Sequence, residues 1–506
     1  MTYVLRRSSF VPLTVLLLLL LVPAFSANAA EQLKLTIIHL NDAHAHYIPY
    51  KEKGFEQLIG GFGKAAAVMT DLEAGGRGDG REVLKLYAGD LLTGTPFSTA
   101  FRGKMGVTLL NEMKFDAMTV GNHEFDYGRG NLLAGLKPLM AFPILSANIR
   151  TEAGKYPFER SVTKQYPSAK TNVVIFGLTT ADTPTATLPA NVKGLVFDDA
   201  IKTARKLLAG FKDDDLIIAL THLGVDEDRK LAAACPKIDV IIGGHSHTAI
   251  EKPLKVHNTI ICQAGAYAKY VGGLNLDVED GRVVRHDGGL VLLGPEVKED
   301  SKMAAMVSEY QAKMDAALKT VVGKSEVFLE GTRSAVRSGR ATNLGSLIAY
   351  NMAATAGAEV ALLNGGAIRA SIAKGDVTLG DIETALPFSD TLVKLGLTGE
   401  DIASILQRSV DLAEGSGGKL QTFGVDWGLQ RGKVRIEKIR GQRFKPTKRY
   451  TVATNNFLAS GGDGYDTFKT KGRNSCDTLV PVADLLVNYI KDKKAITQEV
   501  LDGIKQ

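Results

Sequence analysis

Side chains that can bind metal ions gather in five short clusters in the first half of the chain. Each cluster follows an apolar run, and together they hold five of the nine histidines. The clusters are Asp42-Ala43-His44, Gly89-Asp90, Asn122-His123, Thr221-His222 and Gly243-Gly244-His245-Ser246-His247. Ligands in α/β sheets collect beyond the carboxyl ends of the strands. Because imidazole, carboxylate and amide ligands suit Zn²⁺, Mn²⁺ or iron, the pattern predicts a metal centre.

The candidate ligands are too many for one four-coordinate ion. Two ions would need a shared ligand, and Asp90, in the middle of the set, has two carboxylate oxygens to share. Two ions about 3.5–4 Å apart could hold a hydroxide between them and neutralise a phosphoryl group during its transfer. Taken singly, each cluster is more typical of a polar turn or a buried histidine. The ordered set favours a dinuclear centre.

The segments around these clusters predict the elements that would position them. Buried strands are expected from the apolar runs that begin at Leu33, Val83, Ala117, Phe142, Asn172, Leu216, Val240 and Thr259. Helical patterns at 61–74 and 199–212 alternate with them, which indicates a layered α/β domain ending near Leu293. An apolar stripe at 303–318 predicts a helix before a second α/β domain. We interpret this helix as an interdomain connector, with packing entirely on the first domain as the alternative.

The N-terminus has the features of a secretory leader. Arg6 and Arg7 precede the leucine-rich run Val11–Val22, and Ala27-Asn28-Ala29 fits the small-residue rule for cleavage. The apolar run is shorter than the roughly 20 residues that a spanning helix needs. We therefore expect residues 1–29 to be a cleaved signal peptide. The mature protein would be periplasmic or secreted, without stable membrane insertion.

Charge and cysteine usage narrow the class of protein further. The formal net charge is +6, and removal of Arg6 and Arg7 with the leader leaves +4. This charge is too small and too dispersed to suggest a nucleic-acid polymer as partner. An odd, small number of cysteines argues against a disulfide framework. Export would allow one bridge, with Cys235 and Cys262 as the candidate pair, and isolated buried thiols are the alternative.

Five motifs in this order resemble those of the calcineurin-like metallophosphoesterases: HLNDAHAH, YAGDLLTG, VGNHEFDYG, THLG and GGHSH. More narrowly, the chain resembles the secreted 5'-nucleotidase family, which includes periplasmic UDP-sugar hydrolases and cyclic-nucleotide phosphodiesterases. The resemblance implies a four-layer α/β sandwich over residues 30–298, in which two β-sheets are flanked by helices. A connecting helix over 299–320 would join it to a second α/β domain over 321–506, which binds the nucleotide.

The resemblance also implies roles for individual side chains. The ligands of two divalent ions, Zn or Mn, would be Asp42, His44 and His247 for one ion, Asn122, His222 and His245 for the other, and Asp90 for both. His123 would face the substrate as a cation, and would stabilise the phosphoryl oxygens or protonate the leaving group. Asp126 would hold the His123 ring and favour its protonated form. Glu124 and Tyr127 are expected to do no more than pack in the loop and face solvent.

Motifs of the second half resemble the nucleotide-binding domain of the same family, and include NGGAIR and NNFLASGGDGY. The resemblance implies a phosphate contact, a stacking ring and a ribose contact among Asn364, Gly365, Arg369, Phe457 and Asp463. Arg340 is expected as a further phosphate contact and Phe423 as a second stacking aromatic. Ala341, Tyr350 and Asp390 depart from the residues that are frequent in the family, which leaves the exact substrate open.

These features predict a dinuclear-metal phosphohydrolase that removes the 5'-phosphate from nucleotides by in-line attack of a metal-bridging hydroxide. UDP-sugars or cyclic nucleotides are further candidate substrates, and we expect a monomer or a homodimer. A thiosulfohydrolase-like sulfur-oxidation enzyme of the same family is an alternative, and it would not need a base-stacking pocket. A non-catalytic nucleotide-binding protein is a third, but it predicts losses among the seven ligands, which are all present.

Overall fold

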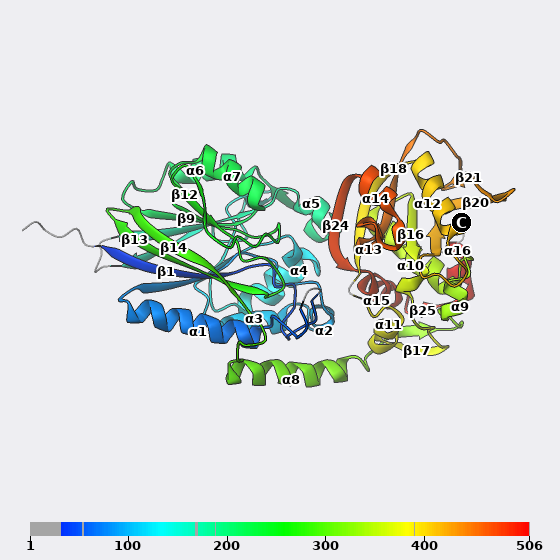
Figure 1. The fold of residues 1–506 in the computed structure, drawn as a ribbon, viewed down its shortest axis with the longest axis horizontal. Helices are drawn as coiled ribbons and strands as arrows, with labels where there is room; N and C mark the ends of the chain where they lie inside the picture. The colour runs from blue at the N-terminus through cyan, green and yellow to red at the C-terminus, as the bar shows by residue number, and fades with distance from the viewer. Residues whose placement is uncertain (1–31, 53–54, 167–170, 188, 389, 505–506) are drawn as a thin grey trace, which may run out of the picture.

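Two β-sheets stacked face to face form the centre of the N-terminal domain (Figure 1). The computed structural model describes residues 32–504 except 53–54, 167–170, 188 and 389, so the predicted signal peptide lies outside the described residues. The first sheet has, in spatial order, β14 (Arg282–Leu292), β13 (Tyr270–Glu279), β1 (Leu33–Leu40), β2 (Glu82–Tyr87), β3 (Ala117–Thr119) and β4 (Ile144–Leu145). The second has β11 (Leu254–Val256), β12 (Thr259–Cys262), β10 (Val240–Ile242), β9 (Leu216–His222), β7 (Thr171–Thr179) and β6 (Ser161–Tyr166).

Helices cover the outer face of each sheet, so the domain has four layers (Figure 1). One side carries α1 (Phe62–Gly78), α2 (Pro96–Phe101) and α3 (Lys104–Met113), and the other carries α6 (Ala200–Leu208) and α7 (Val225–Ala234). Three apolar clusters separate the layers: one between the sheets and one under each set of helices. The predicted four-layer sandwich is therefore confirmed, and each of the eight predicted apolar runs contains a strand.

Shorter elements complete this domain. They are η1 (His123–Phe125), α4 (Gly128–Gly130), η2 (Asn131–Leu136), η3 (Lys137–Leu139), β5 (Ile149–Thr151), α5 (Thr183–Ala186), η5 (Pro189–Val192) and β8 (Leu195–Phe197). All three cysteines are free thiols, and Cys235 and Cys262 are buried. The structure thus favours isolated thiols over a Cys235–Cys262 bridge. None of the helices in the described residues is long and apolar enough to cross a membrane.

A five-stranded sheet forms the centre of the C-terminal domain, in the order β19 (Leu420–Phe423), β16 (Val360–Asn364), β23 (Arg449–Asn455), β18 (Thr391–Thr398) and β24 (Arg473–Pro481). One of its apolar clusters includes α10 (Asn343–Ala356), α11 (Leu379–Ala385), α15 (Val482–Lys493) and α16 (Gln498–Ile504). The other includes α12 (Gly399–Asp411) and α14 (Asp466–Lys471). The second domain is therefore also α/β.

Smaller sheets and turns border this centre. One three-stranded sheet contains β17 (Gly375–Thr378), β15 (Val321–Ser325) and β25 (Ala495–Ile496), and another contains β20 (Val425–Gln430), β21 (Lys433–Ile439) and β22 (Gln442–Arg443). The short helical turns are α9 (Arg333–Val336), η6 (Gly365–Ala367), α13 (Asn456–Ala459) and η7 (Gly462–Gly464).

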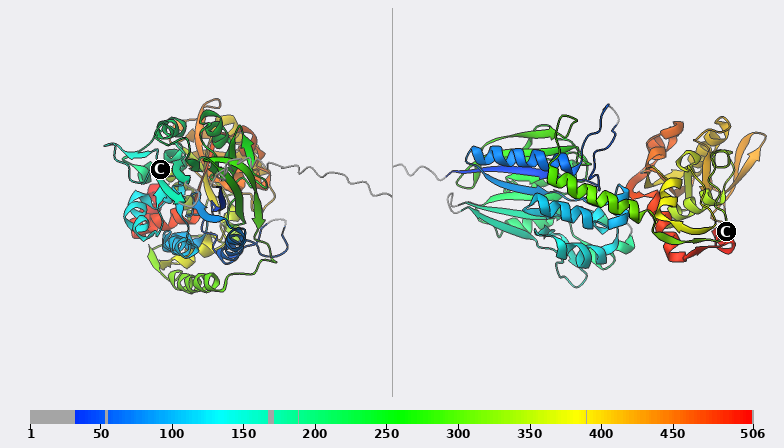
Figure 2. Two further views of the ribbon diagram at one scale, coloured as in Figure 1. Left: turned by 90° about the vertical axis from the view of Figure 1, so that its left-hand side faces the viewer. Right: turned by 90° about the horizontal axis from the view of Figure 1, so that it is seen from below.

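Helix α8 (Ser301–Ala317) lies along the N-terminal domain beside α1 and α3, and then leads into the C-terminal domain (Figure 2). The Asp300 side chain caps it by accepting the Met303 N–H at 2.8 Å. Met303, Val307 and Met314 pack into the N-terminal core. Leu318, directly after the helix, contacts the apolar clusters of both domains. The helix therefore packs on the first domain and also connects the two.

The buried carboxyl group of Asp484, on α15, joins the C-terminal domain to the N-terminal domain. It accepts hydrogen bonds from the Thr99 hydroxyl on α2 and from the Tyr127 hydroxyl, the latter at 3.3 Å. Tyr127 therefore makes an interdomain contact rather than only facing solvent. Burial raises the pKa of Asp484 to about 6. In this domain arrangement the carboxyl group binds a proton more readily than it does in water.

Candidate active site

The predicted metal ligands sit in loops whose backbone is strained. Asp42, His44, Asp90, His245 and His247 all have positive φ, between 46° and 77°. Residues with side chains rarely adopt this left-handed conformation, and such strain concentrates at functional sites. Each of these loops follows one of the strands β1, β2 and β10. The ends of these strands therefore aim several polar side chains at one point.

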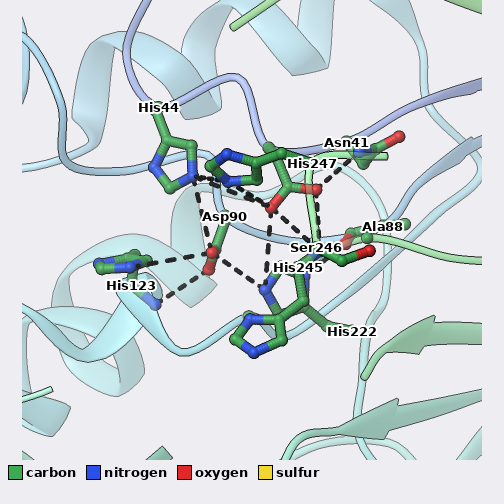
Figure 3. Close-up of polar contacts among 12 residues, drawn as sticks. Asn41, His44, Ala88, Asp90, His123, His222, His245, Ser246 and His247 are labelled. Atoms are coloured by element: carbon green, nitrogen blue, oxygen red, sulfur yellow. Dashed lines mark hydrogen bonds and ion pairs between the residues drawn. The ribbon is translucent and has the colours of Figure 1, made fainter. Parts of the chain in front are cut away.

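Six of the predicted ligands form two groups within which the ligand atoms lie no more than 4.8 Å apart. The groups are Asp42, His44 and His247, and Asp90, His222 and His245. The Asp90 carboxylate touches both groups: its Oδ2 lies 3.8 Å from His44 Nε2 and 3.0 Å from His222 Nε2 (Figure 3). The structure thus places Asp90 where a shared ligand would have to be.

Hydrogen bonds orient two of the rings so that Nε2 faces the centre. His222 Nδ1 donates to the Ala88 carbonyl at 2.7 Å, and His44 Nδ1 lies 3.1 Å from the Thr93 carbonyl. A neutral imidazole that donates from Nδ1 presents a lone pair at Nε2, as a metal ligand must. The Asn122 Oδ1 atom is buried without a hydrogen-bond partner, and His222 Nε2 faces Asp90 Oδ2 at 3.0 Å. A cation at the centre would satisfy Asn122 Oδ1 and could replace the proton between His222 and Asp90.

The electrostatics also fit a pair of cations. Burial lowers the pKa of His44 to about 3 and that of His245 to about 4, which keeps these rings neutral. Burial alone would lower the pKa of His222, but the Asp90 carboxylate outweighs burial, and the pKa is raised to about 10. The space between His222 and Asp90 therefore favours positive charge. The donor set and the unpartnered Asn122 Oδ1 atom fit two divalent ions.

Glu124 supports the loop that carries Asp90, which corrects the expectation that it faces solvent. Its side chain is completely buried. Oε2 accepts the N–H groups of Gly121 at 2.7 Å and Asp90 at 3.0 Å, and Oε1 accepts that of Leu91 at 2.8 Å. Burial and the charge of Asp90 raise the pKa of Glu124 to about 7. The buried carboxyl satisfies three backbone donors that would otherwise be unpaired.

His123 and Asp126 form a hydrogen-bonded pair at the edge of the centre. His123 Nδ1 lies 2.6 Å from Asp126 Oδ2, and its Nε2 lies 4.0 Å from Asp90 Oδ2 (Figure 3). The hydroxyls of Thr93 and Thr187 also donate to Asp126, at 2.6 and 2.7 Å. Burial lowers the pKa of His123, but the charges of Asp126 and Asp90 raise it to about 9. The ring is thus a cation with one N–H directed at the centre.

A cavity of about 260 Å³, which we call the aromatic pocket, lies in the C-terminal domain and contains most of the predicted substrate contacts. Its lining residues are Arg337, Asn364, Gly366, Ala367, Arg369, Phe388, Asp390, Gly417, Phe457 and Asp463. Gly365 shapes the wall without lining it. A Cβ atom there would lie 2.1 Å from the Val336 carbonyl oxygen, so the turn needs glycine. Four of the predicted residues, Asn364, Arg369, Phe457 and Asp463, therefore meet in one pocket.

Two expected contacts lie elsewhere, and two unexpected residues take their places in the pocket. Arg340 is exposed beyond the turn at Gly339, whereas Arg337 is buried with its Nε unpartnered. Phe423 packs against Tyr350, with ring centroids 5.2 Å apart. The second pocket aromatic is instead Phe388, which the Arg369 guanidinium covers at 5.1 Å. Phe388 lies in the sequence LPFSD at residues 386–390, and such a short sequence does not reveal which ring faces a pocket.

The metal-side cavity, also of about 260 Å³, is separate from this pocket. It lies between the domains, and its lining residues are His44, His46, Tyr50, Glu52, Gly94, Tyr267, Thr391, Asn456, Asp477 and Leu479. It shares no lining residue with the aromatic pocket. In this domain arrangement the candidate metal centre therefore faces β24, and not Phe388 and Phe457.

Comparisons with known proteins agree with this geometry. The family description "Calcineurin-like phosphoesterase" matches residues 35–249, and "5'-nucleotidase, C-terminal domain" matches residues 321–470. The chain is 33% identical, over 86% of its length, to the trifunctional nucleotide phosphoesterase protein YfkN of Bacillus subtilis, and it spans 32% of that protein. It is 30% identical to a 5'-nucleotidase of Vibrio vulnificus, over 85% of this chain and 86% of the relative.

A solved structure shows the same two-domain fold. The NAD nucleotidase NadN of Haemophilus influenzae superimposes with a TM-score of 0.78 over 92% of this chain and 97% of NadN, at 23% identity. This likeness shows the fold alone, whereas the Vibrio relative and the two matched domains show the family. The chain belongs to the 5'-nucleotidase family of calcineurin-like metallophosphoesterases, and it is a hydrolase of phosphoric ester bonds.

Proposed function

We propose that this enzyme removes the 5'-phosphate from nucleotides, with two divalent ions held by the two ligand groups that share Asp90. The observation that carries the proposal is the position of the Asp90 carboxylate between His44 and His222. Zn²⁺ or Mn²⁺ bound there would act as a Lewis acid on the phosphoryl oxygens. Both names of the sequence relatives, phosphoesterase and 5'-nucleotidase, support this reaction class.

His123 would act on the phosphoryl group directly. Its Nε2–H points into the centre, so it can donate a hydrogen bond to a phosphoryl oxygen or a proton to the leaving oxygen. Asp126 holds the ring through Nδ1, and two threonine hydroxyls hold Asp126. The His123 orientation is therefore preset before substrate binds, which lowers the cost of reaching the transition state.

The pocket of the C-terminal domain would select the nucleotide. Phe388 and Phe457 are 46% and 41% exposed, which leaves ring surface available for a base. Arg337 and Arg369 offer guanidinium groups to phosphate, and Asp463 can accept hydrogen bonds from ribose hydroxyls. Because this pocket and the metal-side cavity share no residue, we infer that the domains must rearrange to bring a bound nucleotide to the ions.

The aromatic pocket favours a nucleotide over a thiosulfonate carried on a protein cysteine. A thiosulfohydrolase would gain nothing from two rings placed to stack on a base. We also infer export to the periplasm or medium, because residues 1–29 have the leader features described above.

Product analysis with a panel of substrates tests the proposal. Purified protein with Mn²⁺ or Zn²⁺ is incubated with AMP, ADP, UDP-glucose, 2',3'-cyclic AMP, bis-p-nitrophenyl phosphate and a cysteine thiosulfonate, and released phosphate is measured for AMP and ADP. We expect AMP to be hydrolysed. Binding of AMP without release of phosphate would instead support a non-catalytic nucleotide-binding protein, and thiosulfonate cleavage without nucleotide hydrolysis would support the sulfur-oxidation alternative.

A further inference from the structure

The small sheet of β20, β21 and β22 is rich in cations. From Val425 to Arg443 it has six Lys or Arg residues and two acidic residues, a net charge of +4, and three further cations raise the net charge of residues 425–449 to +7. The whole 506-residue chain has a net charge of +6. The positive charge of this protein is therefore concentrated in one 25-residue segment, which corrects the expectation of a dispersed charge, and the rest of the chain is close to neutral.

The cations of this sheet lie on its solvent side. Along β21, Lys433 and Arg435 are exposed, whereas Ile436 and Ile439 pack into the core of the domain. Lys438 is also exposed, and it lies opposite Asp426 of β20 on one side and Arg443 of β22 on the other. Like charges directly opposite each other destabilise a sheet, so an anionic partner would stabilise the Lys438–Arg443 pair.

The protein itself does not neutralise these charges. Within the described part of the chain, Lys433, Arg435, Lys438 and Arg443 have no carboxylate oxygen within 4.0 Å, although Lys448, nearby in sequence, pairs with Glu359 at 2.7 Å. The one polar contact between side chains on this face joins Arg435 to the Gln430 amide oxygen at 3.2 Å. The four cations are therefore available to a partner.

An apolar side chain lies at the tip of the same sheet. Leu429 is 57% exposed, next to the turn at Arg431 and Gly432, whose φ angles are 52° and 76°. Figures 1 and 2 both show β20 and β21 extending past the rest of the C-terminal domain. A flat surface could therefore approach the tip without a clash with the body of the protein.

We propose that this basic sheet, Val425–Arg443, attaches the protein peripherally to an anionic phospholipid surface. Each Lys or Arg near such a surface strengthens binding roughly fivefold, and the effect falls within a Debye length. Leu429 would enter the boundary between head groups and acyl chains, where exposed apolar side chains are stabilised. A purely electrostatic partner, such as a soluble polyanion, would make no use of the exposed leucine. The attachment does not depend on the hydrolytic reaction.

Sedimentation of the full chain with vesicles tests this attachment. Vesicles of phosphatidylcholine containing phosphatidylglycerol should carry the protein down at low salt, and vesicles of phosphatidylcholine alone should not. The double substitution Lys433→Ala and Arg435→Ala should weaken binding by roughly 25-fold. The matched control is Lys252→Ala with Lys255→Ala, two exposed cations of the N-terminal domain, and it should bind as the parent does. Thermal unfolding of every variant checks that it is folded.

Leu429→Ser separates a membrane from a soluble polyanion. The proposal requires this variant to bind anionic vesicles more weakly than the parent at the same salt concentration, while its retention on a heparin column is unchanged. The proposal is overturned if the parent does not sediment with anionic vesicles. It is also overturned if the two double variants lose binding equally, or if Leu429→Ser binds vesicles as tightly as the parent.

Discussion

Replacement of Glu124 tests whether a buried carboxyl group positions the Asp90 loop. In Glu124→Gln, the amide oxygen can take the place of Oε2 and keep the Asp90 and Gly121 N–H groups. The new NH₂ group then faces the Leu91 N–H, which loses its acceptor. One buried, unpaired backbone donor costs about 1–3 kcal/mol of unfolding free energy. Glu124→Ala leaves three donors unpaired, which costs about 3–9 kcal/mol if the losses add.

The assay is denaturant unfolding of metal-free protein, with metal binding as a second measurement. A matched control is Glu227→Gln, which breaks an exposed pair with Lys230 and should cost less than about 1 kcal/mol. Because the Asp90 carboxylate lies between the two ligand groups, a displaced loop should also weaken Mn²⁺ binding. The reasoning is refuted if Glu124→Gln is as stable as the parent and binds Mn²⁺ equally well, or if Glu124→Ala is no less stable than Glu124→Gln.

Three further predictions follow from the site and the domain contact. His123→Ala should retain its metal content but lose about 10²–10⁴-fold in turnover, and full activity would exclude the proton-donating role. Phe388→Ala should raise KM for AMP roughly 5- to 150-fold, because it removes a stacking surface, whereas Phe423→Leu should leave KM unchanged. The Asp484 pKa is about 6 in the docked domains and 3.8 for the free group, so the docked state binds more protons. The free energy of docking therefore weakens by about 3 kcal/mol as pH rises through this interval. Small-angle scattering between pH 4 and about 6.5 should detect this change, and Asp484→Asn should abolish it; an unchanged response in the variant would contradict the assignment.

The positions of the candidate metal ligands could be predicted because they are local features of strand ends. Apolar runs predict strands, and the polar residues at the end of β9 and directly after β1, β2 and β10 must lie at the same edge of a layered sheet. The hairpin of β13 and β14 also has a local signal, the turn Asp280-Gly281, although its strands are not among the eight predicted apolar runs.

The residues that the sequence did not reveal act through contacts between distant segments. The Glu124 carboxyl accepts N–H groups from a loop more than 30 positions earlier in the chain, so no local pattern indicates its burial. Arg337 and Arg340 lie three positions apart, and only the turn at Gly339 determines which one faces the pocket. The fold of β19 directs Phe423 toward Tyr350, and its own sequence does not indicate this direction.

Anomalous diffraction from crystals loaded with Mn²⁺ tests the dinuclear centre most directly. We predict two manganese peaks, one at each ligand group, with an oxygen of Asp90 within about 2.0–2.2 Å of both ions. A single peak, or two peaks of which one has no contact with Asp90, would contradict the account.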